Sequence, residues 1–269
     1  MRVARSYDCE KIDAIEKIRT PEIFEEAVAA FSIVAKKLSD NKRIIKSAGG
    51  IAGILDRNRE KLLYSPNLQK WVNRALKQEL TKILGTDLNI ENDASMVGLG
   101  EAVYGAGKGY EIVSYITVST GVGGSRIVNG KIDENVNGFE PGHQIIDADG
   151  SLCSDCVGTG DLESYISGSA IKKRFNKNPK EIKDPNLWIQ LSNWLAYGLL
   201  NTSVHWSPDI IVLGGSMIVG DPAISVEQTE NKLRDIMAHL PIKPIIKKAE
   251  LSDIGGIMGS LAYLKNTLN

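Results

Sequence analysis

Three short segments hold the residues whose types and spacing could carry out chemistry. They are Asn92-Asp93-Ala94, then Glu140-Pro141-Gly142-His143, and finally the stretch from Cys153 to Glu163. Together they offer a candidate carboxylate base, two further acids and a histidine. Carboxylates and histidine can take up protons and hydrogen-bond to hydroxyl groups. We therefore expect the three segments to surround one pocket.

The position of Asp93 leaves two interpretations open. Residues 88–91 are predicted as a strand and residues 94–104 as a helix, so Asp93 lies at a strand-to-helix junction. Aspartate is a preferred helix N-cap, and this structural interpretation is favoured when the residue is considered alone. The second interpretation is a base, since the amino end of a helix favours the ionised carboxylate. That interpretation needs partners from the other two segments.

A candidate metal site overlaps the second and third segments. Cys153 and Cys156, with His143 upstream and Asp161 downstream, supply four ligands of the kind that bind zinc tetrahedrally. One CxxC pair is only half of a zinc-ribbon pattern, so metal and incidental thiols both stay open. Both are favoured over a disulfide framework, because the chain has three cysteines.

Glycine-rich segments follow two predicted strands in the first half of the chain. Residues 43–48 are predicted as a buried strand that ends at glycines 49, 50 and 53. These glycines could form a plain turn or let the backbone approach a ligand, and both interpretations are equally favoured. Residues 112–120 lead through Gly121–Gly124 to a second strand at 125–128. The amides at such a hairpin tip can face a phosphate, although no Walker lysine follows.

Two further segments complete this outline. Asn129-Gly130 is a strong two-residue hairpin signal after the strand at 125–128. The unbroken apolar run at 209–213 predicts a buried parallel strand. Gly214-Gly215 follow its carboxyl end, where ligands bind in open α/β sheets.

Composition sets the broad class of the protein. The chain has 269 residues, is 42% hydrophobic and 24% charged, and carries a net charge of −1. These values are typical of a folded water-soluble protein and give no nucleic-acid or anionic-membrane footprint. No apolar run reaches the length of a membrane span and no signal peptide is evident, so a cytoplasmic location is predicted.

Five motifs together resemble the ROK family of sugar kinases and related repressors over nearly the whole chain. The motifs are Asn92-Asp93-Ala94, Ser119–Gly124, Glu140–His143, Leu162-Glu163 and Ile211–Gly215. The resemblance implies an α/β fold of the two-domain, actin-like (ribonuclease H-like) kind. We expect a small domain from residues 1–107 plus 256–269 and a large domain from residues 108–255.

The resemblance also implies ATP-dependent phosphorylation of a hexose or amino-hexose, as in glucokinase-like and N-acylmannosamine kinase-like enzymes. Asp93 would be the catalytic base, and ATP with Mg²⁺ the phosphoryl donor. The implied sugar-binding residues are Asn67, Asn92, Asp93, Glu140, His143 and Glu163. The implied nucleotide-binding residues are Thr120, Gly121, Gly123, Gly214 and Gly215.

The chain departs from the family pattern in two places. ROK kinases begin with a strand and an Asp-x-Gly-Gly-Thr-Lys phosphate loop, whereas this sequence starts at what looks like the following strand, Met1–Ala4. Either the natural start lies upstream or the strand is lost, and the expected fold is N-terminally truncated. The family's zinc loop reads Cys-x-Cys-Gly-x-x-Gly-Cys, whereas here the first pair is CxxC and Asp161 stands in place of the last cysteine. Zn²⁺ on His143, Cys153, Cys156 and Asp161 stays a candidate.

Three functional hypotheses follow. The first is an ATP-dependent sugar kinase. The second is a sugar-binding protein of the same fold whose catalysis is impaired by the missing phosphate loop. The third, a repressor, ranks last because such repressors carry a helix-turn-helix ahead of this region. A homo-oligomer is expected by resemblance, and the particular sugar and hydroxyl are left open.

Overall fold

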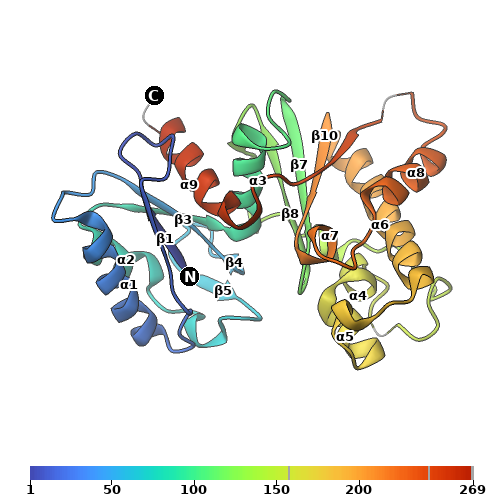
Figure 1. The fold of residues 1–269 in the computed structure, drawn as a ribbon, viewed down its shortest axis with the longest axis horizontal. Helices are drawn as coiled ribbons and strands as arrows, with labels where there is room; N and C mark the ends of the chain where they lie inside the picture. The colour runs from blue at the N-terminus through green and yellow to red at the C-terminus, as the bar shows by residue number, and fades with distance from the viewer. Residues whose placement is uncertain (157, 242, 268–269) are drawn as a thin grey trace.

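The fold separates into two groups of elements joined through a pair of helices, as the computed structural model shows (Figure 1). It describes residues 1–156, 158–241 and 243–267. The first lobe contains β1–β6 with α1 and α2, and the second lobe contains β7–β11 with α4–α8. Helices α3 (Asp93–Tyr104) and α9 (Gly255–Asn266) lie between them.

The first lobe is built from three two-stranded pairs and two helices. Strands β1 (Arg2–Arg5) and β2 (Ala14–Lys17) are antiparallel, β3 (Ser47–Ile51) and β6 (Leu88–Asn92) are parallel, and β4 (Ile54–Leu55) and β5 (Leu62–Tyr64) are antiparallel. Helices α1 (Phe24–Ser39) and α2 (Leu76–Leu84) flank these strands, with a 3-10 turn at Gln69–Trp71. Their apolar faces share one core that includes Phe24, Leu62, Trp71, Leu76 and Ile90.

The second lobe contains a mixed sheet in the order β11-β10-β7-β8-β9. Its strands are β7 (Ile112–Val118), β8 (Val122–Val128), β9 (Lys131–Ile132), β10 (Ile210–Gly214) and β11 (Ile245–Lys248). Strand β10 runs parallel to both β7 and β11, whereas β8 is antiparallel to β7. The helices are α4 (Leu162–Ile166), α5 (Gly168–Phe175), α6 (Pro185–Trp206), α7 (Ser216–Val219) and α8 (Val226–Ile236).

Both faces of this sheet are buried, which explains the unbroken apolar sequence of β10. Ile211 and Leu213 face the core formed with α6, while Ile210 and Val212 face the core formed with α3. Because successive side chains of a strand point to opposite faces, a strand covered on both sides must be apolar throughout. The prediction of a buried parallel strand at 209–213 is therefore confirmed.

Helices α3 and α9 pack closely against each other. Gly100 lies against the backbone of Gly255 and Gly259, and a Cβ atom at Gly259 would collide with the Met96 carbonyl group. Small residues at these positions let the two helix backbones approach without an intervening side chain. Because α3 also covers the sheet of the second lobe, this helix pair joins both lobes.

Several predicted boundaries are wrong. The first strand after α1 begins at Ser47 and contains Gly49 and Gly50, whereas residues 43–46 form no strand and Ile45 is 69% exposed. A Cβ atom at Gly50 would lie 3.0 Å from the Asp93 Cα, so the close packing of α3 on β3 accounts for glycine inside this strand. Helices α4 and α5 follow each other with a single break at Ser167, whose backbone is extended and whose side chain caps α5.

The turn between β7 and β8 also differs from the prediction. It is formed by residues 119–121, and Gly123 and Gly124 lie within β8 rather than at the tip. A side chain at Gly124 would meet Pro141, which explains glycine in the strand. The Asn129-Gly130 turn is confirmed, with φ of 52° and 70° at the two residues. Among the described residues, no helix is both long and apolar enough to cross a bilayer.

Candidate functional site

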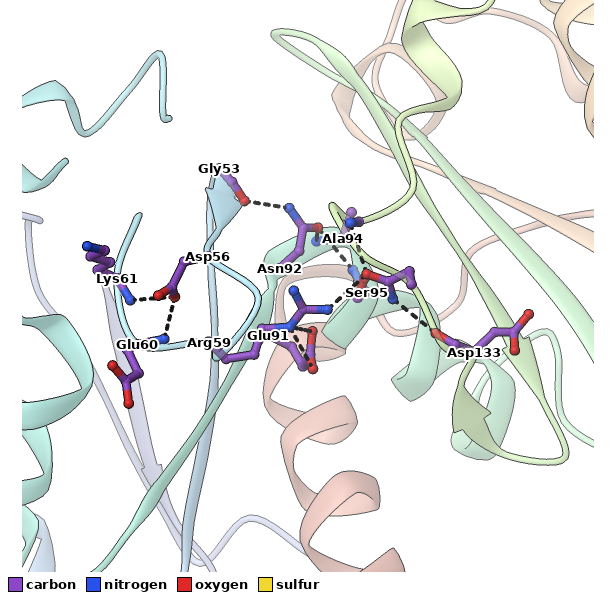
Figure 2. A network of polar contacts seen from close by, with 12 residues as sticks. Gly53, Asp56, Arg59, Glu60, Lys61, Glu91, Asn92, Ala94, Ser95 and Asp133 are labelled. Atoms are coloured by element: carbon purple, nitrogen blue, oxygen red, sulfur yellow. Dashed lines mark hydrogen bonds and ion pairs between the residues drawn. The ribbon is translucent and has the colours of Figure 1, made fainter. Parts of the chain in front are cut away.

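Asn92, rather than Asp93, caps helix α3. The Asn92 Oδ1 atom accepts hydrogen bonds from the backbone N–H groups of Ala94 at 2.8 Å and Ser95 at 3.3 Å. Its Nδ2 atom donates to the Gly53 carbonyl oxygen at 3.1 Å (Figure 2). The interpretation of Asp93 as the cap is therefore wrong, because Asp93 is the first residue inside the helix. Its carboxylate is left available for another role.

The Asp93 side chain can be reached by water, although protein fills much of the space around its carboxylate. Its Oδ1 atom accepts a hydrogen bond from the Ala94 N–H at 2.9 Å. The surrounding protein desolvates the carboxylate and raises its pKa, an effect that hydrogen bonds from backbone amides partly oppose. A carboxylate with a raised pKa that water can reach is a suitable proton acceptor.

The charges of Asp93, His143 and Glu163 all act on Glu140. Contacts support the same neighbourhood, because β8 packs against both α3 and the segment Pro141–His143, and the Val122 N–H of β8 donates to the Glu163 Oε2 at 2.7 Å. Burial raises the pKa of Glu140, the charges of Glu163 and Asp93 raise it further, and His143 opposes them. The four side chains come from three parts of the chain. Asp93 begins α3, Glu140 directly precedes the 3-10 turn η2 (Pro141–His143) that ends at His143, and Glu163 lies in α4. The structure thus brings the acids and the histidine predicted from the sequence into one electrostatically coupled group.

His143 is held by Asp161 at the edge of this group. The His143 Nδ1 and Asp161 Oδ2 atoms are 3.0 Å apart. This hydrogen bond raises the pKa of His143, and nearby Glu163 adds to the effect. Burial alone would raise the pKa of Asp161, but hydrogen bonds from His143 and Ser164 hold it below its usual value. Asp161 also caps α4 through the Ser164 N–H at 3.0 Å.

The predicted nucleotide-binding residues gather at the carboxyl ends of β7 and β10. Gly214 pairs with Thr117 in the register of β10 and β7, so the segments that follow, Gly215 and Thr120-Gly121, lie at the same end of the sheet. Gly215 has φ of 88°, and a Cβ atom there would lie 2.6 Å from the Thr117 Oγ1. Gly123 in β8 pairs with the same Thr117 from the other side of β7, and a Cβ atom there would lie 3.5 Å from the Ala94 Cβ at the start of α3.

Asn67 lies in an exposed loop after β5. This loop is closed by a hydrogen bond from the Leu68 N–H to the Ser65 Oγ at 3.2 Å. Ser65 in turn lies against Gly53, where an added Cβ would be 2.8 Å from the Ser65 Cβ. The loop therefore adjoins the backbone that Asn92 contacts, and sugar binding by Asn67 stays a prediction.

The described residues do not assemble the predicted zinc ligands. A disulfide joins Cys153 to Cys156, so the preference for thiols or metal over a disulfide is wrong for this structure. His143 and Asp161 hydrogen-bond to each other and do not belong to the Cys153, Asp155 and Cys156 group, whose ligand atoms lie within 4.8 Å of one another. The predicted site needs both cysteines as thiolates and all four ligands converging on one point, so the structure does not fit the predicted zinc site.

Two contacts near the site were missed by sequence reasoning. The Gly53 carbonyl that receives Asn92 lies in a glycine-rich run, which was a usable signal. Arg59 and Asn135, which hydrogen-bond to each other across the two lobes, lie in loops where neither periodicity nor a motif marks them.

Comparison with known proteins fits this geometry. The sequence profile of the ROK family matches residues 6–267. The xylose repressor of Bacillus subtilis (strain 168) is 29% identical over 191 residues, which cover 65% of this chain but only 49% of the repressor. The fructokinase of Zymomonas mobilis subsp. mobilis is 28% identical over 268 residues, which cover 94% of this chain and 88% of the fructokinase. The chain thus spans about half of one curated relative and most of another.

Solved structures agree with the profile match. The crystal structure of a ROK family glucokinase from Streptomyces griseus, in complex with glucose and AMPPNP, has a TM-score of 0.74 and 26% sequence identity. The match covers 96% of this chain and 93% of that glucokinase. The predicted α/β, actin-like fold is therefore confirmed, while the predicted domain boundaries stay a prediction. This chain belongs to the ROK family.

Proposed function

We propose that this chain transfers the γ-phosphoryl group of ATP to a hydroxyl group of a hexose or amino-hexose. The main supporting observation is the coupled group of Asp93, Glu140, His143 and Glu163. A sugar presents several neighbouring hydroxyl groups, and carboxylates with a histidine supply the acceptors and donors that fix them. The likeness to a glucokinase bound to glucose and an ATP analogue supports the same reaction class.

In this proposal Asp93 is the base. The attacking hydroxyl oxygen forms a bond to the γ-phosphorus while the bond from that phosphorus to the ADP oxygen breaks, and the hydroxyl proton passes to the Asp93 carboxylate. Phosphoryl transfer depends mainly on positioning and charge stabilisation. Asn92 lies beside Asp93, and its side-chain amide has one N–H group left to donate to the sugar. Its other N–H group donates to Gly53, and its oxygen accepts from Ala94. Asn67, Glu140, His143 and Glu163 orient the remaining hydroxyl groups.

ATP is proposed to lie across the carboxyl ends of β7 and β10, at Thr120, Gly121, Gly214 and Gly215, with Gly123 in the neighbouring strand β8. The backbone at Gly215 adopts a left-handed conformation that favours glycine, and the absence of side chains lets phosphate or adenosine approach the main chain. A Mg²⁺ ion bound to ATP would neutralise charge on the transferring phosphoryl group.

A coupled ADP-release assay with glucose, fructose, mannose, allose and N-acetylmannosamine tests the proposal. We expect turnover with at least one sugar and a loss of about 10²–10⁴-fold in kcat for Asp93→Asn, the range for a general base. Asp87→Asn is the matched control, because Asp87 lies near the other end of β6 and pairs with Lys77 on the surface. Full turnover by Asp93→Asn would show that Asp93 is not the base.

A second candidate function is sugar binding without catalysis. Its support is the likeness to a xylose repressor, whose 29% identity is similar to the 28% of the fructokinase although the match covers less of both chains. Calorimetry separates the two functions. A binding protein would take up a sugar with equal affinity in the presence and absence of ATP and release no ADP.

The proposal places this chain in the cytoplasm as a homo-oligomer that acts on sugar and ATP, without a nucleic-acid or membrane partner. Equilibrium sedimentation tests the assembly, and a monomer would contradict it. A mobility shift with DNA would contradict the absence of a nucleic-acid partner.

A further inference from the structure

Arg59 joins the two lobes beside the candidate site. Its Nε atom lies 3.3 Å from Oε1 and 3.2 Å from Oε2 of Glu91, two residues before Asp93 (Figure 2). Its Nη2 atom donates to the Oδ1 atom of Asn135 at 2.8 Å, in the loop that leads to Glu140. One guanidinium group therefore contacts strand β6, which leads directly into the proposed base, and the loop that carries a proposed sugar ligand.

The hairpin between β4 and β5 holds Arg59 in this position. The Asp56 carbonyl accepts the Arg59 N–H at 2.9 Å, and the Asp56 Oδ1 atom accepts the N–H groups of Glu60 at 2.7 Å and Lys61 at 3.0 Å. Arg59 itself has φ of 59°, a left-handed conformation that is uncommon for a residue with a side chain. The turn thus fixes the direction in which the arginine leaves the backbone.

The contact is better shielded than an ordinary surface ion pair. The side chains of Arg59 and Glu91 are 21% and 15% exposed. Exposed ion pairs contribute little because water screens them and both side chains lose freedom. A planar guanidinium that binds two partners at once loses less freedom for each hydrogen bond formed. We therefore expect Arg59 to fix the relative positions of its partners.

Asn135 connects Arg59 to the shape of the loop. Its Oδ1 atom also accepts the N–H of Gly138 at 2.9 Å, and its Nδ2 atom donates to the Asp133 carbonyl at 2.9 Å. Phe139 then forms a β-bridge with Gly124. The loop is thus fixed by Arg59 and Asn135 at its start and by β8 directly before Glu140.

We propose that Arg59 is a positioning residue that holds the loop of residues 133–140, and with it Glu140, in place opposite Asp93. The consequence for sugar binding rests on the proposed function, while the consequence for the loop does not. Loss of Arg59 should loosen the loop and weaken sugar binding more than it slows the chemical step, because Glu140 is proposed to bind the sugar and Asp93 to take the proton.

The experiment compares Arg59→Ala, Arg59→Lys, Asn135→Ala and the Arg59→Ala/Asn135→Ala double variant with the unchanged chain. Hydrogen exchange of the Gly138 amide reports on the loop, calorimetry with glucose reports on sugar affinity, and steady-state kinetics separate KM from kcat. Arg74→Ala is the matched control, because Arg74 pairs with Glu25 within the first lobe.

For Arg59→Ala we expect exchange at Gly138 to speed up about tenfold and KM for sugar to rise about tenfold, the effect of losing one charge-assisted hydrogen bond. The change in kcat should be smaller. Arg59→Lys should lie in between, since an ammonium can pair with Glu91 but lacks the fork that also reaches Asn135. The effect of the double variant should be less than the sum of the two single effects, because either change alone already removes the Arg59–Asn135 hydrogen bond.

Two outcomes would overturn the proposal. One is unchanged Gly138 exchange in a folded Arg59→Ala variant, or in Arg59→Lys if Arg59→Ala does not fold. The other is strictly additive effects of the two alanine changes. Faster Gly138 exchange in a chain that binds no sugar would support the role of Arg59 and reject the proposed function.

Discussion

The Oε2 atom of Glu163 accepts a 2.7 Å hydrogen bond from the backbone N–H of Val122. This contact ties the first turn of α4 to the start of β8. Gly121, the residue before Val122, belongs to the turn proposed to face ATP, while Glu163 is proposed to bind the sugar. A single hydrogen bond therefore sets how far apart the two substrates would lie.

Gly121→Ala should disturb this contact. A Cβ atom at Gly121 would lie 2.6 Å from the Glu163 Oε2, closer than side chains approach one another, so Glu163 would have to move. We expect KM for sugar to rise by about tenfold, as measured in the ADP-release assay, because a displaced carboxylate no longer meets its hydroxyl group.

Gly123→Ala is the matched control for that change. A Cβ atom at Gly123 would lie 3.5 Å from the Ala94 Cβ and 3.6 Å from the Thr117 Cγ2, which is ordinary van der Waals contact. We expect KM for sugar to stay within about twofold of its value in the unchanged chain. Equal damage from the two substitutions would show that any side chain in this hairpin is harmful.

Asp161→Asn should separate the charge of the His143–Asp161 pair from the cap of α4. Asparagine caps helices as well as aspartate does, so α4 should persist. The pKa of His143 should fall toward its usual value, since the hydrogen bond that its ring donates to Asp161 is the main cause of the rise. Titration of the His143 ring protons by NMR measures this change, and an unmoved pKa would contradict the pairing.

The same pair gives stability a predictable pH dependence. The pKa of His143 is raised in the folded state. The contribution of His143 to the stability of the fold is therefore complete below the unfolded histidine pKa of about 6.5 and is lost as pH rises through the folded-state pKa. Because the pKa of Asp161 is lowered, the stabilisation is present above the unfolded aspartate value of about 3.9 and is lost as pH falls through the folded value. Thermal unfolding should lose this pH dependence in Asp161→Asn.

Glu101→Ala should strongly destabilise the fold. The Glu101 side chain is buried in α3, and its carboxylate accepts backbone N–H groups from Ala106, Glu250 and Leu251 at 2.8–3.2 Å. Ala106 lies between α3 and β7, and Glu250 and Leu251 lie between β11 and α9. These are the two connections between the helix pair and the second-lobe sheet. Truncation would remove the acceptor of all three N–H groups, of which that of Ala106 belongs to a buried residue, at a cost of about 3 kcal/mol in the free energy of unfolding.

Urea denaturation measures that free energy. The exposed Glu111, in the segment leading into β7, supplies the control, because Glu111→Ala should change the free energy of unfolding by less than about 0.5 kcal/mol. Equal stability of the two variants would contradict a structural role for the buried carboxylate.

Metal analysis and thiol counting test the Cys153–Cys156 pair. From the structure we expect a metal-free protein in which these cysteines react with thiol reagents only after reduction. Reduction should lower the free energy of unfolding by about 2 kcal/mol, the loop-entropy value for so short a loop. Stoichiometric zinc that is lost in both His143→Ala and Asp161→Ala would restore the four-ligand prediction.

Part of the candidate site could be predicted from local sequence pattern. The strand-to-helix junction at Asp93 follows from the apolar pattern, whereas Glu140 and Glu163 were assigned to the site through motifs that resemble those of the ROK family. The choice between Asn92 and Asp93 as the cap could not be made in this way. Both are good caps, and the decision depends on the Gly53 carbonyl, which lies in the bend between β3 and β4, far from Asn92 in the sequence.

The wrong boundaries share a physical cause. Gly49 and Gly50 lie in a strand, and Gly124 lies in β8, because neighbouring backbone or side chains leave no room for a Cβ atom at Gly50 and Gly124. A sequence shows a glycine but does not show whether it serves a turn or close packing. The link from Arg59 to Asn135 was equally hidden, since it depends on how two loops face each other across the lobes.

The packing of α3 against α9 also bears on how the chain folds during synthesis. Helix α9 begins about 150 residues after α3 ends, yet glycines in both helices let their backbones meet. A ribosome releases the segments of α3 and the first lobe long before it makes α9, so the helix that carries Asp93 lacks its partner for most of that time. The second-lobe sheet can assemble earlier, and the arrangement around Asp93 is completed only when the last helix arrives.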